Sequence, residues 1–231
     1  MPTEPTVVVR GDRLTRRFTT PAATVIALDD VDVEMMAGSL TVVAGPSGSG
    51  KSVLLSMISC TDRPSAGQVR VAGALVTDLG RRARRRFRQE RLGIVLPQPS
   101  DNLLDSASAL DNVRWALRVR RGKAAARGAT EAAQPLMEDV GIASLGHKHT
   151  RELSGGEQQR LALVCALMGN PDVLVAAEPP ASLDATSSMA VVAALRALAA
   201  RGVTMIVASH DHHVIDVADH VIRLDHGRRV A

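Results

Sequence analysis

One eight-residue stretch constrains this chain more than any other: Gly45–Ser52, which reads GPSGSGKS. It follows an apolar run at 40–44 that indicates a buried strand, and it opens a segment, Lys51–Ser59, whose apolar spacing predicts a helix. Glycines let the backbone wrap closely around oxyanions, and the free N–H groups at the start of a helix point toward them. The stretch therefore predicts a polyphosphate site on a strand–loop–helix unit.

The positions of this stretch have distinct expected roles. Lys51 carries the positive charge that reaches the outer phosphates, and the Ser52 hydroxyl is the expected Mg²⁺ ligand. Val53 follows where a hydroxyl side chain would have met an inner phosphate, and because its backbone N–H still donates, we expect weakened rather than abolished binding. The expected nucleotide-contacting residues of this segment are Gly45, Pro46, Ser47, Gly48, Ser49, Gly50, Lys51, Ser52 and Val53.

Short β-branched runs alternate with helical patterns along the chain, which indicates an α/β fold. The runs at 40–44, 173–176 and 203–208 are almost continuously apolar, as expected for central parallel strands covered on both faces. Hydrophobic residues make up 45% of the 231 residues but aromatic residues only 1%, so the core must be aliphatic. Further strands of this kind are expected at 68–71, 92–96 and 221–224.

Two regions depart from this alternation. Near the N-terminus, short strand patterns are separated by turn residues without any helix, which predicts an antiparallel β-layer packed against the main sheet. Between Leu96 and Val173 only helical windows occur, which predicts an inserted helical subdomain. The expected N-terminal strands are 6–10, 14–18, 24–28 and 31–34, and the expected inserted helices are 107–120, 123–140 and 156–168.

A second anion-binding pattern begins the last of these helices. Ser154 is a favourable N-cap residue, and the two glycines after it allow an anion to approach the exposed N–H groups. A helix cap alone would explain the serine, but it would not explain the whole octet LSGGEQQR at Leu153–Arg160. Here the sequence resembles the ATP-binding cassette (ABC) family of transporter ATPases, whose signature reads LSGGQ or LSGGE. The signature residues are Leu153, Ser154, Gly155, Gly156, Glu157 and Gln158.

The resemblance extends over about residues 10–230, with the motifs in the family order. Gln98 matches the glutamine that in the family contacts Mg²⁺ and joins the core to the helical subdomain, and His210 matches the switch histidine near the γ-phosphate. Phe18 looks like the aromatic residue that stacks on adenine, although the sequence alone is equally compatible with a core role. The residues that match the D-loop are Ser182, Leu183 and Asp184.

The fold implied by the resemblance is a P-loop NTPase (RecA-like) core with an N-terminal antiparallel β-subdomain and an inserted α-helical subdomain. The implied organisation is a single ABC ATPase domain over 1–231. Its nucleotide-binding core and β-subdomain would occupy 1–97 and 166–231, and its helical subdomain with the signature would occupy 98–165. The pattern looks most like the lipoprotein-releasing and macrolide-exporter branch of the family.

The resemblance also implies cofactors and partners. ATP and Mg²⁺ are the implied cofactors, and the implied assembly is a head-to-tail dimer with a second copy or a homologous ATPase subunit. In such a dimer the loop at 45–52 of one subunit and Ser154–Gly156 of the other close on the same nucleotide. The implied function is to couple ATP binding, dimer closure and hydrolysis to a membrane-spanning permease subunit docked near Gln98. The implied location is cytoplasmic, peripheral on the inner face of the cell membrane.

The sequence departs from the family at the end of the strand at 173–176, where the family has Asp-Glu-Pro and this chain has Ala177, Glu178 and Pro179. In P-loop enzymes that aspartate holds Mg²⁺ through its water shell, so its loss is expected to slow hydrolysis. Glu178 is retained at the position that in the family polarises the attacking water. The alternative function is therefore a nucleotide-gated interaction module with weak or no hydrolysis. The three departures around the nucleotide are Val53, Ala177 and Pro180.

Other features exclude several function classes. We expect no signal peptide and no membrane span, because no apolar stretch approaches the roughly 20 residues that a bilayer requires. The scarcity of aromatic residues argues against a stacking platform for single strands, and no nucleic-acid partner is expected. Cys60 and Cys165 are expected to be small buried hydrophobes. The neighbours His212 and His213 are expected to be exposed rather than metal ligands.

Seven arginines lie within Arg81–Arg91. On a helix, four of them would share one face while Phe87 points elsewhere. We expect this face to be solvated; contact with anionic lipid headgroups or with an acidic partner loop is the alternative. The four residues are Arg81, Arg84, Arg85 and Arg88.

Overall fold

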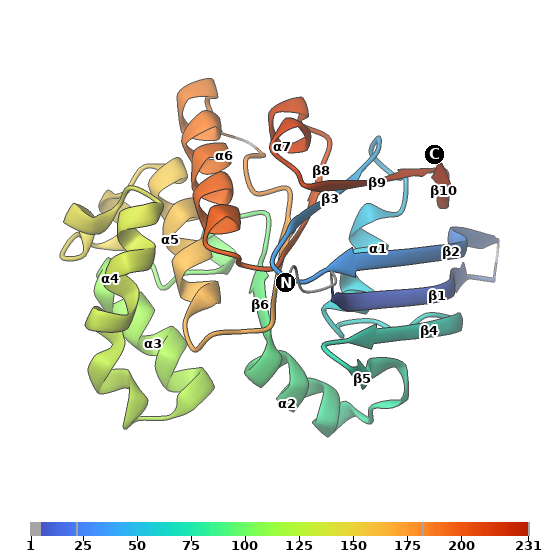
Figure 1. The fold of residues 1–231 in the computed structure, drawn as a ribbon, viewed down its shortest axis with the longest axis horizontal. Coiled ribbons are helices and arrows are strands. Elements are labelled where there is room, and N and C mark those ends of the chain that lie inside the picture. Colours follow the sequence, from blue (N-terminus) through green and yellow to red (C-terminus); the bar gives the residue numbers. More distant parts are fainter. Residues whose placement is uncertain (1–5, 22, 182, 231) are drawn as a thin grey trace, which may run out of the picture.

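The structure, a computed structural model, describes residues 6–21, 23–181 and 183–230. At its centre is a six-stranded sheet with the strand order β10-β9-β3-β8-β7-β6 (Figure 1). All neighbouring strands pair in parallel except β10, which runs antiparallel to β9. The prediction of an α/β fold is confirmed. The strands are β3 (Leu40–Ala44), β6 (Leu92–Val95), β7 (Val173–Ala177), β8 (Met205–Ser209), β9 (His220–Asp225) and β10 (Arg228–Val230).

Alternating side chains of the central strands divide the core into two aliphatic layers. Val43 and Ile206 belong to the layer that contains α1 (Lys51–Ile58) and the N-terminal sheet. Val42 and Val207 belong to the layer formed with the helices on the opposite face. Because both faces are covered, every residue of β3 and β8 is buried, which explains why these strands are continuously apolar.

The second sheet is antiparallel, with the order β2-β1-β4-β5. Its strands are β1 (Val7–Thr19), β2 (Thr24–Met36), β4 (Ala66–Val71) and β5 (Ala74–Leu75). The prediction of four short N-terminal strands is wrong, because β1 and β2 are each continuous over 13 residues. Arg13 and Asp30 adopt left-handed φ angles of 48° and 53°, and the pairing register shifts between Gly11 and Leu14. Bulges of this kind accommodate turn residues without ending a strand.

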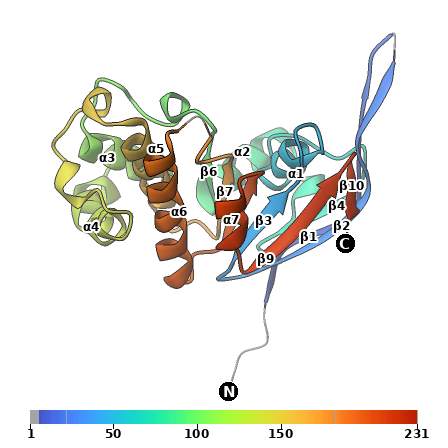
Figure 2. The same cartoon turned by 90° about the horizontal axis from the view of Figure 1, so that it is seen from above.

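The helices between β6 and β7 form one end of the molecule, opposite the antiparallel sheet (Figure 2). They are α3 (Ala109–Arg121), α4 (Ala129–Asp139) and α5 (Gly155–Leu167). This stretch contains no strand, as predicted, although the helix expected over 123–140 is divided into the 3₁₀ turn Ala125–Gly128 and α4. The remaining helices are α2 (Arg81–Arg91), α6 (Ala185–Ala200) and α7 (His212–Asp216), and further 3₁₀ turns are Val76–Asp78, Pro99–Asp101, Ala143–Leu145 and Thr150–Glu152.

The orientation of α2 differs from the expectation. Phe87 is buried in the core, and Arg84 and Arg88 lie on the same side of the helix, where both donate to the carbonyl oxygen of Cys60 just after the end of α1. Arg84 also donates to the Asp62 carbonyl oxygen at 2.7 Å. The prediction that Arg84 and Arg88 lie on a solvated face with Arg81 and Arg85 is wrong, because carbonyl groups at the end of α1 compete with water for the two guanidinium groups.

Both cysteines are buried and free, as predicted. Burial raises the pKa of the Cys60 thiol to about 11 and that of the Cys165 thiol to about 12, so both thiols are protonated at neutral pH. Within the described ranges, none of the helices has both the length and the apolar character needed to cross a membrane.

Candidate functional site

The loop of residues 45–52 connects β3 to α1 and depends on glycine at two positions. Gly50 has a φ of 102°, and a Cβ there would lie 2.6 Å from the carbonyl oxygen of Ala27 on β2. Gly45 has a φ of 152°, and a Cβ there would lie 2.2 Å from the carbonyl oxygen of Leu224 on β9. Any side chain would therefore force the loop away from the strands that support it.

Lys51 is the first residue of α1, and its charged side chain is almost entirely buried, with only 7% exposed. Its Nζ donates to the carbonyl oxygens of Gly45 (2.8 Å) and Pro46 (2.9 Å), so it lies across the mouth of its own loop. The same Nζ lies 3.7 Å from Oε1 of Glu178. A buried ammonium group needs such partners, and a phosphate can replace them because all of them are oxygen atoms.

Glu178 follows β7 directly, and its backbone N–H donates to the carbonyl oxygen of Ala208 on β8. Its φ of 47° is left-handed, which is uncommon for a residue other than glycine and is typical of strained functional positions. Its Oε2 lies 3.0 Å from Nδ1 of His210, which follows β8. Two neighbouring strand ends therefore place a carboxylate and an imidazole beside the buried lysine.

These side chains share one cavity of about 480 Å³. Its lining residues are Ala27, Ser47, Gly48, Gly50, Lys51, Ser52, Val53, Glu178 and His210. The predicted phosphate loop, the predicted water-polarising residue and the predicted switch histidine thus lie together. Gln98 and Phe18 are not among the lining residues.

The oxygen atoms at this cavity fit Mg²⁺ but are few. Ser52 offers a hydroxyl group and Glu178 the one carboxylate among the described lining residues, whereas Ala177 offers no donor where the family has aspartate. Mg²⁺ prefers oxygen ligands and commonly takes one or two from the protein and the rest from phosphates and water. No group of three or more His, Cys, Asp and Glu side chains that could hold a metal alone occurs in the described residues.

Phe18 lies near the end of β1 and is 42% exposed. The guanidinium group of Arg16 lies 4.5 Å from the centre of its ring, within the range of a cation–π interaction. Arg16 is itself held by Asp62, with its Nε donating to Oδ2 at 2.8 Å and its Nη2 to Oδ1 at 3.1 Å. Sequence analysis missed this support. The i,i+2 spacing of Arg16 and Phe18 on one strand was a signal for it, but the partner at Asp62 lies too far away in sequence to be recognised.

The predicted signature forms the start of α5. Ser154 is the N-cap: its hydroxyl accepts from the N–H of Glu157, and its own N–H donates to Glu157 Oε2 at 2.7 Å. That backbone bond holds the pKa of Glu157 below its usual range. A Cβ at Gly156 would lie 2.8 Å from the side chain of Ser187, so glycine allows α5 to approach the start of α6.

The signature and the phosphate loop are separate in one subunit. Neither Ser154 nor Gly155 lines the cavity beside Lys51. Of the predicted D-loop, Leu183 packs close to Gly155 and Asp184 is the N-cap of α6, with its Oδ1 accepting from Ser187. Ser182 lies outside the described residues.

Comparison with known protein families decides the identity. The family model described as ABC transporter matches residues 28–181, which is about two thirds of the chain. The chain belongs to the ABC transporter family. The resemblance of the two motifs to ABC ATPases is thereby confirmed, and so are the P-loop core and the mixed architecture of this ABC cassette.

The ABC relatives include proteins of two named systems. The chain is 38% identical over 224 residues to the lipoprotein-releasing system ATP-binding protein LolD of Anaeromyxobacter dehalogenans, covering 96% of this chain and 90% of LolD. It is 36% identical over 218 residues to the macrolide export ATP-binding/permease protein MacB of Burkholderia thailandensis, covering 94% of this chain and 33% of MacB. The chain therefore corresponds to about one third of the length of MacB.

Solved ABC cassettes share the fold. The dimeric structure of MJ0796, a bacterial ABC transporter cassette, has a TM-score of 0.83 at 27% identity and covers 96% of this chain and 97% of that one. A dimeric post-hydrolysis state of MJ0796 bound to ADP and Pi has a TM-score of 0.80 at 28% identity, with the same coverage. This chain is thus an ATP-binding subunit of the LolD and MacB type, in a family whose members hydrolyse ATP.

Proposed function

We propose that this chain binds and hydrolyses ATP at the loop of residues 45–52 and couples this cycle to a membrane-spanning permease. The observation that carries the proposal is the convergence of three side chains on one cavity: Lys51 Nζ lies 3.7 Å from Glu178 Oε1, and Glu178 Oε2 lies 3.0 Å from His210 Nδ1. A cation for the phosphates, a base for water and a donor for developing charge are the groups that phosphoryl transfer to water requires.

Each residue has one role in this proposal. On binding, Lys51 Nζ exchanges the Gly45 and Pro46 carbonyl oxygens for phosphate oxygens, and backbone N–H groups of the loop bind the same phosphates. Glu178 orients the attacking water and accepts its proton. His210 holds the Glu178 carboxylate and donates to the terminal phosphate.

Ser52 would hold Mg²⁺, with Gln98 as the second predicted ligand. When bound, Mg²⁺ neutralises the charge that develops on the β- and γ-phosphates. Gln98 is exposed, and the loop that carries it is fixed by Asn102, whose amide donates to the Gln98 carbonyl oxygen at 2.8 Å. Phe18 would stack on the adenine ring, with Arg16 on its other face.

A second subunit completes the site. Ser154 and the glycines after it leave N–H groups at the start of α5, away from the cavity of their own chain. A head-to-tail dimer would bring this N-terminus of one subunit onto the phosphates bound by the other, where it adds anion-binding groups. The dimeric state of the MJ0796 structures supports this arrangement.

A groove beside the core fits a permease segment. It has a volume of about 670 Å³ and lies between α2, β6, α3 and α5. Four of its lining side chains are large, apolar and 42–51% exposed: Leu96, Leu104, Trp115 and Val119. Exposed apolar clusters of this kind mark protein interfaces. Gln98 lies between the lining residues Leu96 and Asp101, so a docked segment would meet the loop that leads to the nucleotide.

The proposal keeps the division predicted from the sequence, with core and β-subdomain in 1–97 and 166–231 and the helical subdomain in 98–165. Movement of a docked permease segment would then shift the helical subdomain, and with it the signature, relative to the core. The proposed location, at the inner face of the membrane on a permease, follows from this docking and from the LolD and MacB relatives.

We further propose that hydrolysis is attenuated. Ala177 leaves the metal without the aspartate of the family, and Glu178 carries the one carboxylate among the described residues that line the cavity. Loss of a metal-orienting group costs several kcal/mol of transition-state stabilisation, which corresponds to roughly 10²-fold or more in rate. If this loss is complete, the chain acts as a nucleotide-gated interaction module, which is the second candidate function.

Phosphate release from Mg²⁺-ATP tests both candidates. We expect slow release from the purified chain, none from the Glu178→Gln variant, and release at least tenfold faster from Ala177→Asp. Wild-type release no greater than that of Glu178→Gln would select the interaction module. An Ala177→Asp rate equal to that of the wild type would refute the attenuation.

A further inference from the structure

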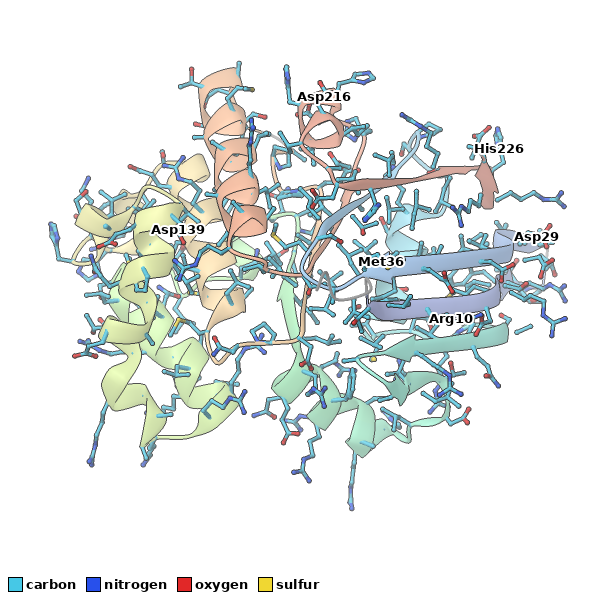
Figure 3. All side chains as sticks on the ribbon, in the orientation of Figure 1. Arg10, Asp29, Met36, Asp139, Asp216 and His226 are labelled. Atoms are coloured by element: carbon cyan, nitrogen blue, oxygen red, sulfur yellow. The ribbon has the colours of Figure 1, made fainter. Side chains whose placement is uncertain are left out.

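The positive charge of the chain is concentrated in one stretch. Residues 81–127 contain thirteen of the 28 Lys and Arg residues but only four of the 24 Asp and Glu residues. The stretch comprises α2, the wall of the groove and α3 with the turn that follows it. The C-terminal ends of α2 and α3 touch, because Arg120 donates to the Gln89 carbonyl oxygen at 3.2 Å. In Figure 3, side chains with blue nitrogen atoms at their ends accordingly project from the lower edge of the molecule, along α2 and the lower ends of α3 and α4.

The structure separates the cations that support the fold from those that do not. Some donate to backbone carbonyl groups: Arg84, Arg88, Arg120 and Arg121. Others pair with carboxylates: Arg86, Arg91 and Arg114. Six are exposed and have neither a carboxylate nor a hydrogen-bond acceptor among the described residues; we name them the basic edge, and they are Arg81, Arg82, Arg85, Arg118, Lys123 and Arg127.

The basic edge is continuous with the groove proposed for the permease. Arg85 lines that groove, and Arg118 lies over the ring of Trp115, another lining residue, at 5.8 Å. A permease segment in the groove would therefore bring the bilayer toward this edge. The orientation of the basic edge toward the bilayer rests on the proposed function, but the charge and the exposure of its side chains do not.

We propose that the basic edge binds anionic phospholipid headgroups. Cytoplasmic loops of membrane proteins carry an excess of Lys and Arg, so a permease would offer this edge like charge, whereas the lipids around it offer phosphates. A nucleic acid fits less well, because Phe87 on α2 is buried and Trp115, the exposed aromatic side chain beside the edge in the described part of the chain, lines the groove. Lipid contact also explains why the basic edge gathers six cations that have no carboxylate partner in the described ranges, in a chain whose net charge is only +4.

Vesicle binding tests the proposal without any permease. The full chain is sedimented with vesicles of phosphatidylcholine alone and with vesicles of phosphatidylcholine and phosphatidylglycerol in equal parts. The test variant combines Arg81→Gln, Arg82→Gln and Lys123→Gln, none of which lines the groove or the nucleotide cavity. The control variant removes three exposed cations from β4, α6 and β9: Arg70→Gln, Arg196→Gln and Arg223→Gln.

Each cation near an anionic surface strengthens partitioning roughly fivefold, so loss of three predicts a decrease of about 100-fold. The control variant should lose at most a few-fold, and wild-type binding should weaken as salt shortens the Debye length below about 10 Å. Equal binding to both vesicle types would overturn the proposal, and so would equal losses in the test and control variants. Tighter binding to a single-stranded oligonucleotide than to the anionic vesicles would instead assign the edge to nucleic acid.

Failure of this proposal is distinct from failure of the proposed function. The test variant should release phosphate from ATP at the wild-type rate, because its three positions lie outside the cavity beside Lys51. An unchanged rate together with unchanged vesicle binding would refute the lipid contact alone.

Discussion

Replacement of Glu178 by glutamine should tighten ATP binding while it abolishes hydrolysis. In the structure Lys51 Nζ is attracted by Glu178 Oε1 at 3.7 Å, and the two side chains are only 7% and 22% exposed. The same carboxylate would face the negative charge of a bound terminal phosphate. Both effects oppose nucleotide binding, and glutamine, which has nearly the same shape, removes both.

The distance sets the size of the expected effect. At 3.7 Å and an effective dielectric constant of about 20, the attraction between Lys51 and Glu178 is about 4 kcal/mol before desolvation. Partial solvation and the cost of holding both charges reduce this severely. If about one third of this attraction remains as a difference between the free and the ATP-bound protein, the dissociation constant for ATP of the Glu178→Gln variant is roughly tenfold lower than that of the wild type.

Calorimetric titration with a non-hydrolysable ATP analogue measures this constant directly. Glu131→Gln on α4 is the matched control, because it removes the same charge from an exposed position and should change affinity less than about twofold. Lys51→Gln, made alone and together with Glu178→Gln, completes a double-mutant cycle with the wild type and Glu178→Gln. We expect a coupling of about 1 kcal/mol between Lys51 and Glu178. Affinity that is unchanged or weaker in Glu178→Gln, or a coupling of zero, would refute the reasoning.

Three further predictions concern stability and reactivity. The double variant Arg84→Gln, Arg88→Gln should lower the free energy of unfolding, measured in urea, by about 2–3 kcal/mol, because it leaves carbonyl groups at the end of α1 without charged donors. The control double variant Arg81→Gln, Arg82→Gln should lower it by less than about 0.5 kcal/mol. Glu157→Ala should lower the free energy of unfolding by about 1 kcal/mol at neutral pH. Because the pKa of Glu157 is lowered in the folded state, its contribution to stability is present above the unfolded pKa and is lost as the pH falls through the folded pKa. The difference in melting temperature between the wild type and the variant should therefore vanish in acid. Both cysteines should resist a disulfide reagent at neutral pH and react once the chain is unfolded, since their pKa values are about 11 and 12; rapid modification of the native chain would show that their burial is wrong.

The central part of the fold was predictable because its signals are local. Continuous apolar runs such as 40–44 and 173–176 can lie only between two covered faces, and the structure buries them there. The loop of residues 45–52 was predictable because glycine is required where a Cβ would collide with neighbouring strands. The signals for the starts of helices are equally local, as the capping box at Ser154 shows.

Features set by distant partners were not predictable. β1 and β2 continue through turn residues because bulges absorb them within a paired sheet, which the spacing of single strands does not reveal. The inward side of α2 depends on carbonyl groups at the end of α1, so Arg84 and Arg88 could not be told apart from their neighbours by sequence. The contacts of Glu178 to Lys51 and His210 likewise join residues that follow two separate strands to the first residue of α1, and its left-handed backbone was not evident from the sequence.

The central claim is that the loop of residues 45–52 grips the phosphates of ATP through its backbone and Lys51. Calorimetry with ATP tests it most directly, comparing the wild type with Lys51→Ala and with Lys123→Ala, which removes an exposed lysine outside the cavity. We expect saturable binding by the wild type and by Lys123→Ala, and a loss of at least tenfold in affinity for Lys51→Ala. Absence of binding by the wild type, or equal affinity of Lys51→Ala, would contradict the account.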